Sequence, residues 1–213
     1  MAILHRATLT PTKPEALGAW VPHQPWSPGP GDVELVGAFR FDDPDGRVGL
    51  EVHLVRLGGV LLQVPLTYRD APLPGAEDHL VTTMVHTALG DRWVYDGLAD
   101  PVFVSTLAAA ALTGTGQAVG IVEDPADDGG PGRRFVVPSP IKLAGGGWTG
   151  GPVAVDRFDL VADAAEGADL RSDRFELRVA RRPEPGPVPA IGLTATVPGD
   201  PDPVVLVEVS PVA

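Results

Sequence analysis

A short run of the chain between residues 86 and 96 gathers the side chains best suited to bind a ligand. It contains His86, Arg92, Trp93, Tyr95 and Asp96. Two aromatic rings beside a basic and an acidic group can stack on a sugar and hydrogen-bond its hydroxyl groups. A packing interpretation is favoured over this one, because aromatic residues of strands most often serve packing: Trp93 and Tyr95 then share one face of a short strand and Asp96 begins a turn. These five residues are the candidate site for a ligand or partner.

Other motifs that resemble chemical sites lack essential parts. The glycine-rich residues 145–151 have no Lys-Ser/Thr pair and no clear following helix, so they predict a flexible connection rather than a phosphate loop. Asp42, Asp43 and Asp45 lack the spacing of a calcium loop and predict a turn. His53 lies on an alternating segment and predicts a surface residue, and none of the five histidines has a partner at metal-binding spacing. We therefore expect no catalytic residue, no metal and no cofactor.

Composition excludes several classes of function. The chain has 213 residues, 44% of them hydrophobic, which is enough to bury a core. Its 16 basic and 28 acidic residues give a net charge of -12, which repels nucleic acid and anionic lipid. Cysteine is absent, so disulfides and cysteine-ligated metals are excluded. The N-terminus has no apolar signal-like segment and no stretch is long enough to cross a membrane, so we expect a cytoplasmic protein.

Two helices are predicted from their end signals. Thr12 and Glu15 form a capping-box pattern, which predicts a helix that ends near Trp20. Asp100 is followed by a proline at the first helical position, and Gly114 follows an alanine-rich segment. This order predicts a second helix between Asp100 and Gly114.

The remaining elements are expected to be strands. In the first half they cover residues 33–41, 48–56, 60–68, 80–86 and 92–95. In the second half they cover residues 118–123, 135–143, 153–160, 174–180, 191–197 and 204–209, while residues 162–173 could form a helical turn. Pro65 predicts an edge position or a bulge. The fold class is α+β with antiparallel sheets, divided into residues 1–115 and a β-rich part, residues 116–213.

The first half contains VPLTYR at residues 64–69 and RWVYDG at residues 92–97, followed by the proline-led helix. With these motifs, roughly residues 1–115 resemble the N-terminal cap domain of bacterial maltokinases. The resemblance implies a cystatin-like arrangement, in which a curved antiparallel sheet is wrapped by helices. A maltokinase continues into a kinase-like domain with a His-Gly-Asp-type loop, but no histidine here precedes Gly-Asp. We therefore expect a stand-alone cap without the catalytic lobe, and not an enzyme.

Three functions are consistent with this resemblance. The first is an interaction or regulatory module that docks on a kinase or another enzyme of α-glucan, maltose or trehalose metabolism. The second is a small-ligand module that binds a sugar or sugar phosphate near Trp93. The third is a kinase-related enzyme that binds ATP. The fold does not decide among them, because one fold serves many functions.

Overall fold

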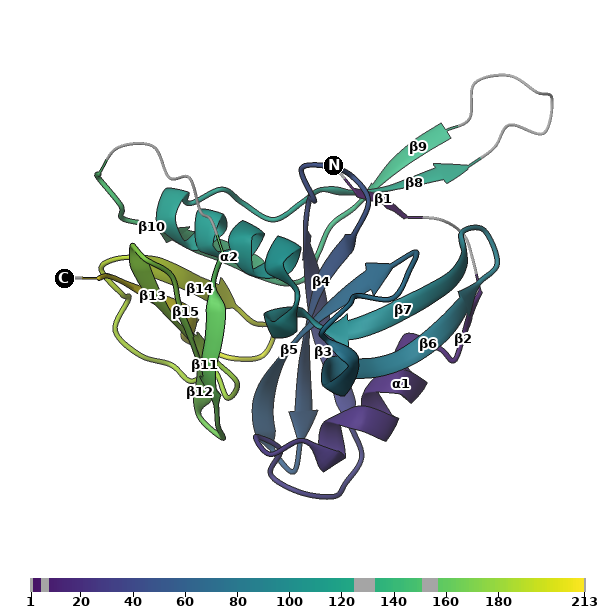
Figure 1. Cartoon of the computed structure of the whole chain (residues 1–213), viewed down its shortest axis with the longest axis horizontal. Coiled ribbons are helices and arrows are strands. Elements are labelled where there is room, and N and C mark those ends of the chain that lie inside the picture. The colour runs from purple at the N-terminus through teal and green to yellow at the C-terminus, as the bar shows by residue number, and fades with distance from the viewer. Residues whose placement is uncertain (1, 5–7, 125–132, 151–156, 213) are drawn as a thin grey trace.

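The computed structural model describes residues 2–4, 8–124, 133–150 and 157–212. Most of the regular secondary structure in these residues is β-strand. Two six-stranded antiparallel sheets form the body, and a smaller three-stranded sheet adjoins them. Figure 1 shows the longer helix, α2, on the side of the first sheet that faces the second sheet. The predicted α+β class is confirmed, with strands far more abundant than helices.

The first sheet has the strand order β2-β6-β7-β5-β4-β3. Its strands are β2 (Leu9–Thr10), β3 (Glu34–Phe41), β4 (Gly49–Leu57), β5 (Val60–Arg69), β6 (Leu80–His86) and β7 (Gly90–Asp96). The turn between β3 and β4 is organised by Asp43, whose carboxylate accepts hydrogen bonds from the backbone amides of residues 45, 47 and 48. Gly58 and Gly59, with φ of 58° and 82°, turn β4 into β5. The predicted meander is confirmed.

Pro65 lies where β5 loses its second neighbour. It faces Val52 of β4, but pairing with β7 begins only at Leu66. On the unpaired side, the amide of Gln63 donates instead to the backbone oxygen of Arg181, 2.9 Å away. Because no strand pairs with this side of β5 at Pro65, the missing proline N–H removes no hydrogen bond between strands. The predicted edge position of Pro65 is confirmed.

The shorter helix, α1 (Lys13–Trp20), covers one face of the first sheet and leads into a 3-10 turn, η1 (Val21–His23). Its capping box is formed as predicted: the Thr12 side chain accepts from the Glu15 amide, and the Glu15 carboxylate accepts from the Thr12 amide. Leu17 packs with Trp26, Leu62 and other apolar side chains of the sheet in a buried cluster. Because α1 lies on this face, strand positions that alternate toward it are buried.

The longer helix, α2 (Pro101–Thr113), follows a 3-10 turn, η3 (Gly97–Ala99). Asp100 caps its first turn and Gly114 ends it in the left-handed conformation with φ 73°, as predicted. Leu107 and Leu112 of α2 belong to a buried cluster that includes Leu54 of the first sheet and Leu206 of the second. One core therefore extends across both halves of the chain.

The second sheet has the strand order β10-β14-β15-β13-β12-β11. Its strands are β10 (Lys142–Gly146), β11 (Asp159–Asp163), β12 (Gly167–Arg171), β13 (Phe175–Ala180), β14 (Gly192–Thr196) and β15 (Val204–Pro211). The predicted helical turn in residues 162–173 is wrong, because β11 and β12 form a hairpin closed by a bond from the Ala164 amide to Gly167. Of the predicted strand at residues 153–160, positions 153–156 lie outside the described residues.

The third sheet has the order β1-β8-β9, with β1 (Ala2–Leu4), β8 (Gly120–Asp124) and β9 (Arg133–Val137). The predicted single strand at residues 135–143 is wrong: it is divided between β9 and β10. Pro138 and Pro140 lie in the break, where they cannot donate to a ladder. The hairpin β8–β9 projects from the body in Figure 1.

The glycine-rich segment is more ordered than the sequence predicts. Gly145 and Gly146 belong to β10, and Trp148 packs edge-on against Phe175 with ring centroids 5.1 Å apart. The Trp148 amide also donates to Leu112 at the end of α2. The expectation of a flexible connection is therefore wrong for residues 145–148, and Gly151 lies outside the described residues.

Candidate functional site

The five residues of the candidate site are divided between the two faces of the first sheet. Successive side chains of a strand point to opposite faces. Arg92 pairs with Met84, which belongs to the cluster beneath α1, so Arg92 and Asp96 alternate toward α1. His86, two residues beyond Met84, lies on the same side. Trp93 and Tyr95 alternate toward the opposite face, so the strand does not bring the aromatic and charged groups together.

Tyr95 and Asp96 are buried, with 2% and 4% of their surface exposed. The Tyr95 hydroxyl accepts a hydrogen bond from the Leu73 amide at 3.0 Å, which fixes the loop after β5. Asp96 begins η3, because one carboxylate oxygen accepts from the Leu98 amide at 3.1 Å. Its other oxygen binds Arg181. Both side chains hold neighbouring segments in place, as the packing interpretation expects.

The other three candidates lie at the more exposed end of the β6–β7 hairpin. Nδ1 of His86 accepts from the amides of Ala88 and Leu89 at 3.2 and 3.1 Å, which organises the turn between the strands. Arg92 is partly exposed and donates to the Asp91 carbonyl oxygen at 2.9 Å. Trp93 is partly buried and lies between β5 and β6 in the ladder. Their role in binding a ligand or partner stays a prediction.

Exposed apolar side chains lie near Trp93 on the face of the sheet opposite α1, beside Arg69 and Thr83, the two residues paired with Trp93. Thr83 is paired with Trp93, Leu80 with Tyr95, and Val85 with Asp91, so all three alternate toward this face. Leu80 is 39% exposed and Val85 54%. We call Leu80, Thr83, Val85 and Trp93 the outer face of β6 and β7. A tryptophan among exposed aliphatic groups is a composition typical of protein interfaces.

A buried arginine that the sequence did not single out connects the two large sheets. Arg181 follows β13, and Nη2 lies 2.5 Å from Asp96 and 2.7 Å from Asp163. Its guanidinium also lies over the Trp26 ring, 4.7 Å from the centroid. Burial lowers the pKa of Arg181, but the carboxylates of Asp96 and Asp163 outweigh it and raise the pKa above its ordinary value. A permanently charged group here acts as a structural bridge.

A second buried charged cluster lies between α1 and the first sheet. Nζ of Lys13 lies 2.5 Å from Glu51, Nε of Arg40 3.1 Å, and Nε2 of His53 3.2 Å. His53 is only 2% exposed, so the expectation of a surface histidine is wrong. The alternation of β4 correctly predicts that His53 points to the opposite face of the sheet from the apolar residues of this strand. However, α1 covers that face, so His53 is buried. The hydroxyl of Tyr68 completes the cluster, 3.3 Å from the His53 ring.

Opposed effects set the protonation of this cluster. Burial raises the pKa of the Glu51 carboxyl, but His53, Lys13 and Arg40 outweigh it and hold that pKa well below its ordinary value. Burial lowers the pKa of Lys13, against the attraction of Glu51. Burial, reinforced by Glu51, raises the pKa of Tyr68 well above its ordinary value. Glu51 is thus held as a carboxylate by three neighbours, which suits a structural ion cluster.

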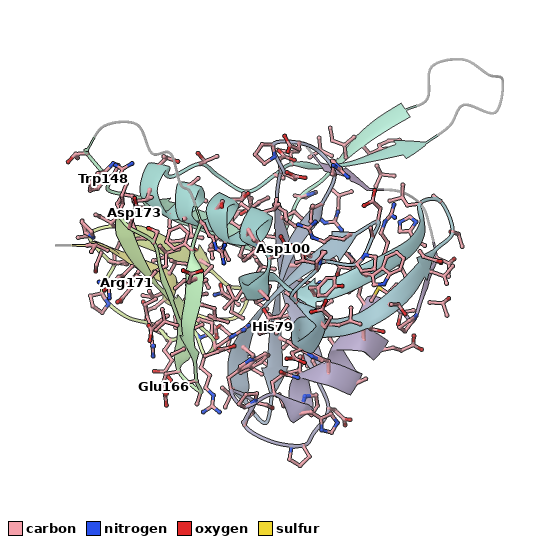
Figure 2. The ribbon with its side chains drawn as sticks, in the orientation of Figure 1. His79, Asp100, Trp148, Glu166, Arg171 and Asp173 are labelled. Atoms are coloured by element: carbon pink, nitrogen blue, oxygen red, sulfur yellow. The ribbon has the colours of Figure 1, made fainter. Side chains whose placement is uncertain are left out.

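A groove of about 670 Å³ lies where the two large sheets approach each other. Its walls are the loop of residues 73–79, which includes the 3-10 turn η2 (Glu77–His79), the first turns of α2, and the start of β11. His79 and Ser105 contribute polar groups, and the buried Phe158 contributes an apolar surface. Figure 2 labels His79, which lies in the groove wall, and Asp100, which precedes the first turn of α2. Tyr95 supports the groove indirectly by binding the Leu73 amide.

Neither a metal site nor a membrane helix is found in the described part of the chain. No group of three or more His, Asp or Glu side chains there has a metal-binding arrangement. None of the described helices is both long and apolar enough to cross a bilayer.

Comparison with known families finds a match within the first half of the chain. Residues 20–100 match the family model of the maltokinase N-terminal cap domain. The match contains α1's last residue, the meander β3–β4–β5, the β6–β7 hairpin and η3. A search of curated proteins finds no match to the chain. The resemblance noted from residues 64–69 and 92–97 is therefore confirmed over residues 20–100.

Proposed function

We propose that this chain is a non-catalytic, cytoplasmic interaction module that docks a protein partner through the outer face of β6 and β7. The observation that supports it is the position of Trp93 between exposed Leu80 and Val85, inside the segment that matches the cap family. The cap resemblance suggests a kinase or another enzyme of α-glucan, maltose or trehalose metabolism as the partner. The charged clusters around Arg181 and Glu51 are engaged in ion pairs, which leaves this apolar face as the better docking surface.

The energetics of protein interfaces favour such a surface. Tryptophan is enriched among the few residues that dominate binding, since its large ring removes much apolar area from water. Leu80 and Val85 would surround Trp93 and exclude water from it. Truncation of such a central aromatic residue commonly costs at least about 2 kcal/mol of binding energy. Trp93 is therefore the residue on which the proposal can be tested.

Affinity capture from native lysate, followed by binding measurements with the purified partner, tests this function. We expect Trp93→Ala to weaken binding at least about tenfold. Leu35→Ala is the matched control, because Leu35 is 47% exposed on β3 of the same sheet but outside the outer face. Thermal unfolding should show that both variants are folded. Failure to capture a specific partner, or equal binding by wild type and Trp93→Ala, contradicts the proposal.

A second candidate function is the binding of a sugar or sugar phosphate in the groove. Its volume of about 670 Å³ falls within the range of roughly 300–1,000 Å³ for small-molecule sites. His79 and Ser105 can hydrogen-bond hydroxyl groups, while Phe158 offers an apolar surface for a sugar ring. Titration calorimetry with maltose, trehalose and glucose phosphates tests it, with Ser105→Ala as the groove variant. Absence of heat at millimolar ligand removes this candidate.

A further inference from the structure

Lys13 combines a largely covered side chain with access to solvent. It is the first residue of α1, and 24% of its side chain is exposed. Its Nζ lies 2.5 Å from Glu51 of β4 and 5.3 Å from the centroid of the Tyr68 ring of β5, over which it is placed. The chain contains only one other lysine, Lys142. The two lysines can therefore be compared directly within one molecule.

The carboxylate that faces Lys13 is shared with two other groups. One oxygen of Glu51 lies 3.1 Å from Nε of Arg40, and the oxygen that contacts Lys13 also lies 3.2 Å from the His53 ring. Burial lowers the pKa of Lys13, and Arg40 reinforces this effect, so together they outweigh the attraction of Glu51. A desolvated lysine beside another cationic group is an established form of activated amine nucleophile.

We infer that Lys13 is a reactive amine that forms a Schiff base with small aldehydes. The neutral Nζ attacks the carbonyl carbon to give a carbinolamine, from which water leaves to give an imine. Overall, the ammonium form of Lys13 and the aldehyde yield a protonated imine and one water molecule, without oxidation or reduction. The adjacent carboxylate of Glu51 is placed to pass the proton from the nitrogen to the departing oxygen.

Conservation of charge favours an aldehyde over an acyl donor at this place. A protonated imine keeps the positive charge of Lys13, so Glu51 retains this partner. An acyl group removes the charge and would leave the buried Glu51 with one partner fewer. The small exposed fraction of Lys13 favours a small reagent. Lys13 and Glu51 lie on the α1 side of the sheet, away from the outer face of β6 and β7, so this reactivity and the proposed partner docking can succeed or fail independently.

Reductive labelling of the full chain with propanal and cyanoborohydride tests the inference. Cyanoborohydride traps each imine as a secondary amine, and peptide mass spectrometry measures Lys13, Lys142 and the α-amino group separately. At about pH 7 we expect Lys13 to be labelled at least about threefold faster than Lys142, although Lys142 is the more exposed lysine. In concentrated urea the two rates should become similar. Slower or equal labelling of Lys13 in the folded chain, or the same preference in urea, overturns the inference.

A Lys142→Arg variant, in which Lys13 is the only lysine, tests the preference for an aldehyde. Propylated Lys13 is still an ammonium group, so thermal unfolding should stay close to that of the untreated variant. Acetylated Lys13 is neutral, and its unfolding midpoint should fall by at least about 3 °C. A variant with both Lys13→Arg and Lys142→Arg, treated with each reagent, corrects for modification of the α-amino group. Equal midpoints after propylation and acetylation overturn the assignment of an aldehyde as the reagent.

Discussion

Arg181 and Asp96 form an ion pair across the junction of the two large sheets, with Nη2 and Oδ2 separated by 2.5 Å. Both side chains are almost completely buried, so water screens the pair little. The pair joins the end of β13 to the end of β7, residues that are 85 positions apart in the sequence. Loss of either partner leaves a buried charge without full compensation.

The first prediction concerns this pair. We expect Arg181→Met or Asp96→Asn to lower the free energy of unfolding by about 3–5 kcal/mol. The double variant should cost clearly less than the sum, because neither charge is then left alone. Urea unfolding of all four proteins measures the coupling. The exposed pair Arg178–Asp169 is the control, and Arg178→Met should cost under about 1 kcal/mol. Additive costs for Arg181 and Asp96 would contradict the bridge.

The second prediction concerns how the stability of the protein changes as the pH falls. The pKa of Glu51 is depressed in the folded protein, so its stabilising effect is fully present above its ordinary pKa of 4.5. That effect is lost as the pH falls through the depressed native value. Glu51→Gln should therefore lower stability at neutral pH and reduce the loss between about pH 5 and pH 3. Urea unfolding at several pH values measures both. Identical pH profiles for the variant and wild type would show that the cluster does not hold Glu51 ionised.

The third prediction concerns the start of α2. Asp100 is fully buried, accepts from the Val102 amide at 3.0 Å, and binds Arg69 at 2.6 and 2.7 Å. Asp100→Ala removes the cap and the ion pair and should cost about 3 kcal/mol of unfolding free energy. Asp100→Asn keeps the cap and should cost less. Thr12→Ala, at the exposed cap of α1, should cost only about 1 kcal/mol. Equal costs for the three changes, measured by urea unfolding, would contradict this assignment.

The fourth prediction concerns the segment after β10. A Cβ at Gly147 would overlap the Ala190 backbone oxygen, and its φ of 105° is unfavourable for any side chain. Gly147→Ala should lower the free energy of unfolding by at least about 2 kcal/mol. Gly116 has open space around it, so Gly116→Ala should be close to neutral. Thermal unfolding compares the two. A neutral Gly147→Ala would show that this segment does not pack against residues 190–191.

Local signals predicted much of the fold. Caps at Thr12 and Asp100 and the glycine after α2 are decided by nearby residues, so the sequence located both helices. The meander of β3 to β5 followed from alternation and turns. The hairpin at residues 162–173 was missed because its strands contain polar and small residues and depend on pairing with β13.

The site was harder to predict because it depends on contacts between distant segments. The sequence grouped Arg92, Trp93, Tyr95 and Asp96 by proximity, whereas strand alternation separates them onto two faces. The burial of His53 depends on α1, which packs on that face from elsewhere in the chain. The partner of Asp96 lies in the second half of the chain. The hydrophobic periodicity of one segment cannot predict contacts with a distant segment of the chain.

The core around α2 restricts how this chain can be recombined with other domains. Leu107 and Leu112 share a buried cluster with apolar side chains of the second sheet, and α2 contacts β10, β14 and β15 of that sheet. A gene fusion that transferred residues 1–115 to a new protein would leave that side of the helix in water, and the product would be prone to aggregate. A viable chimera must therefore bring its own hydrophobic cover for this side of α2.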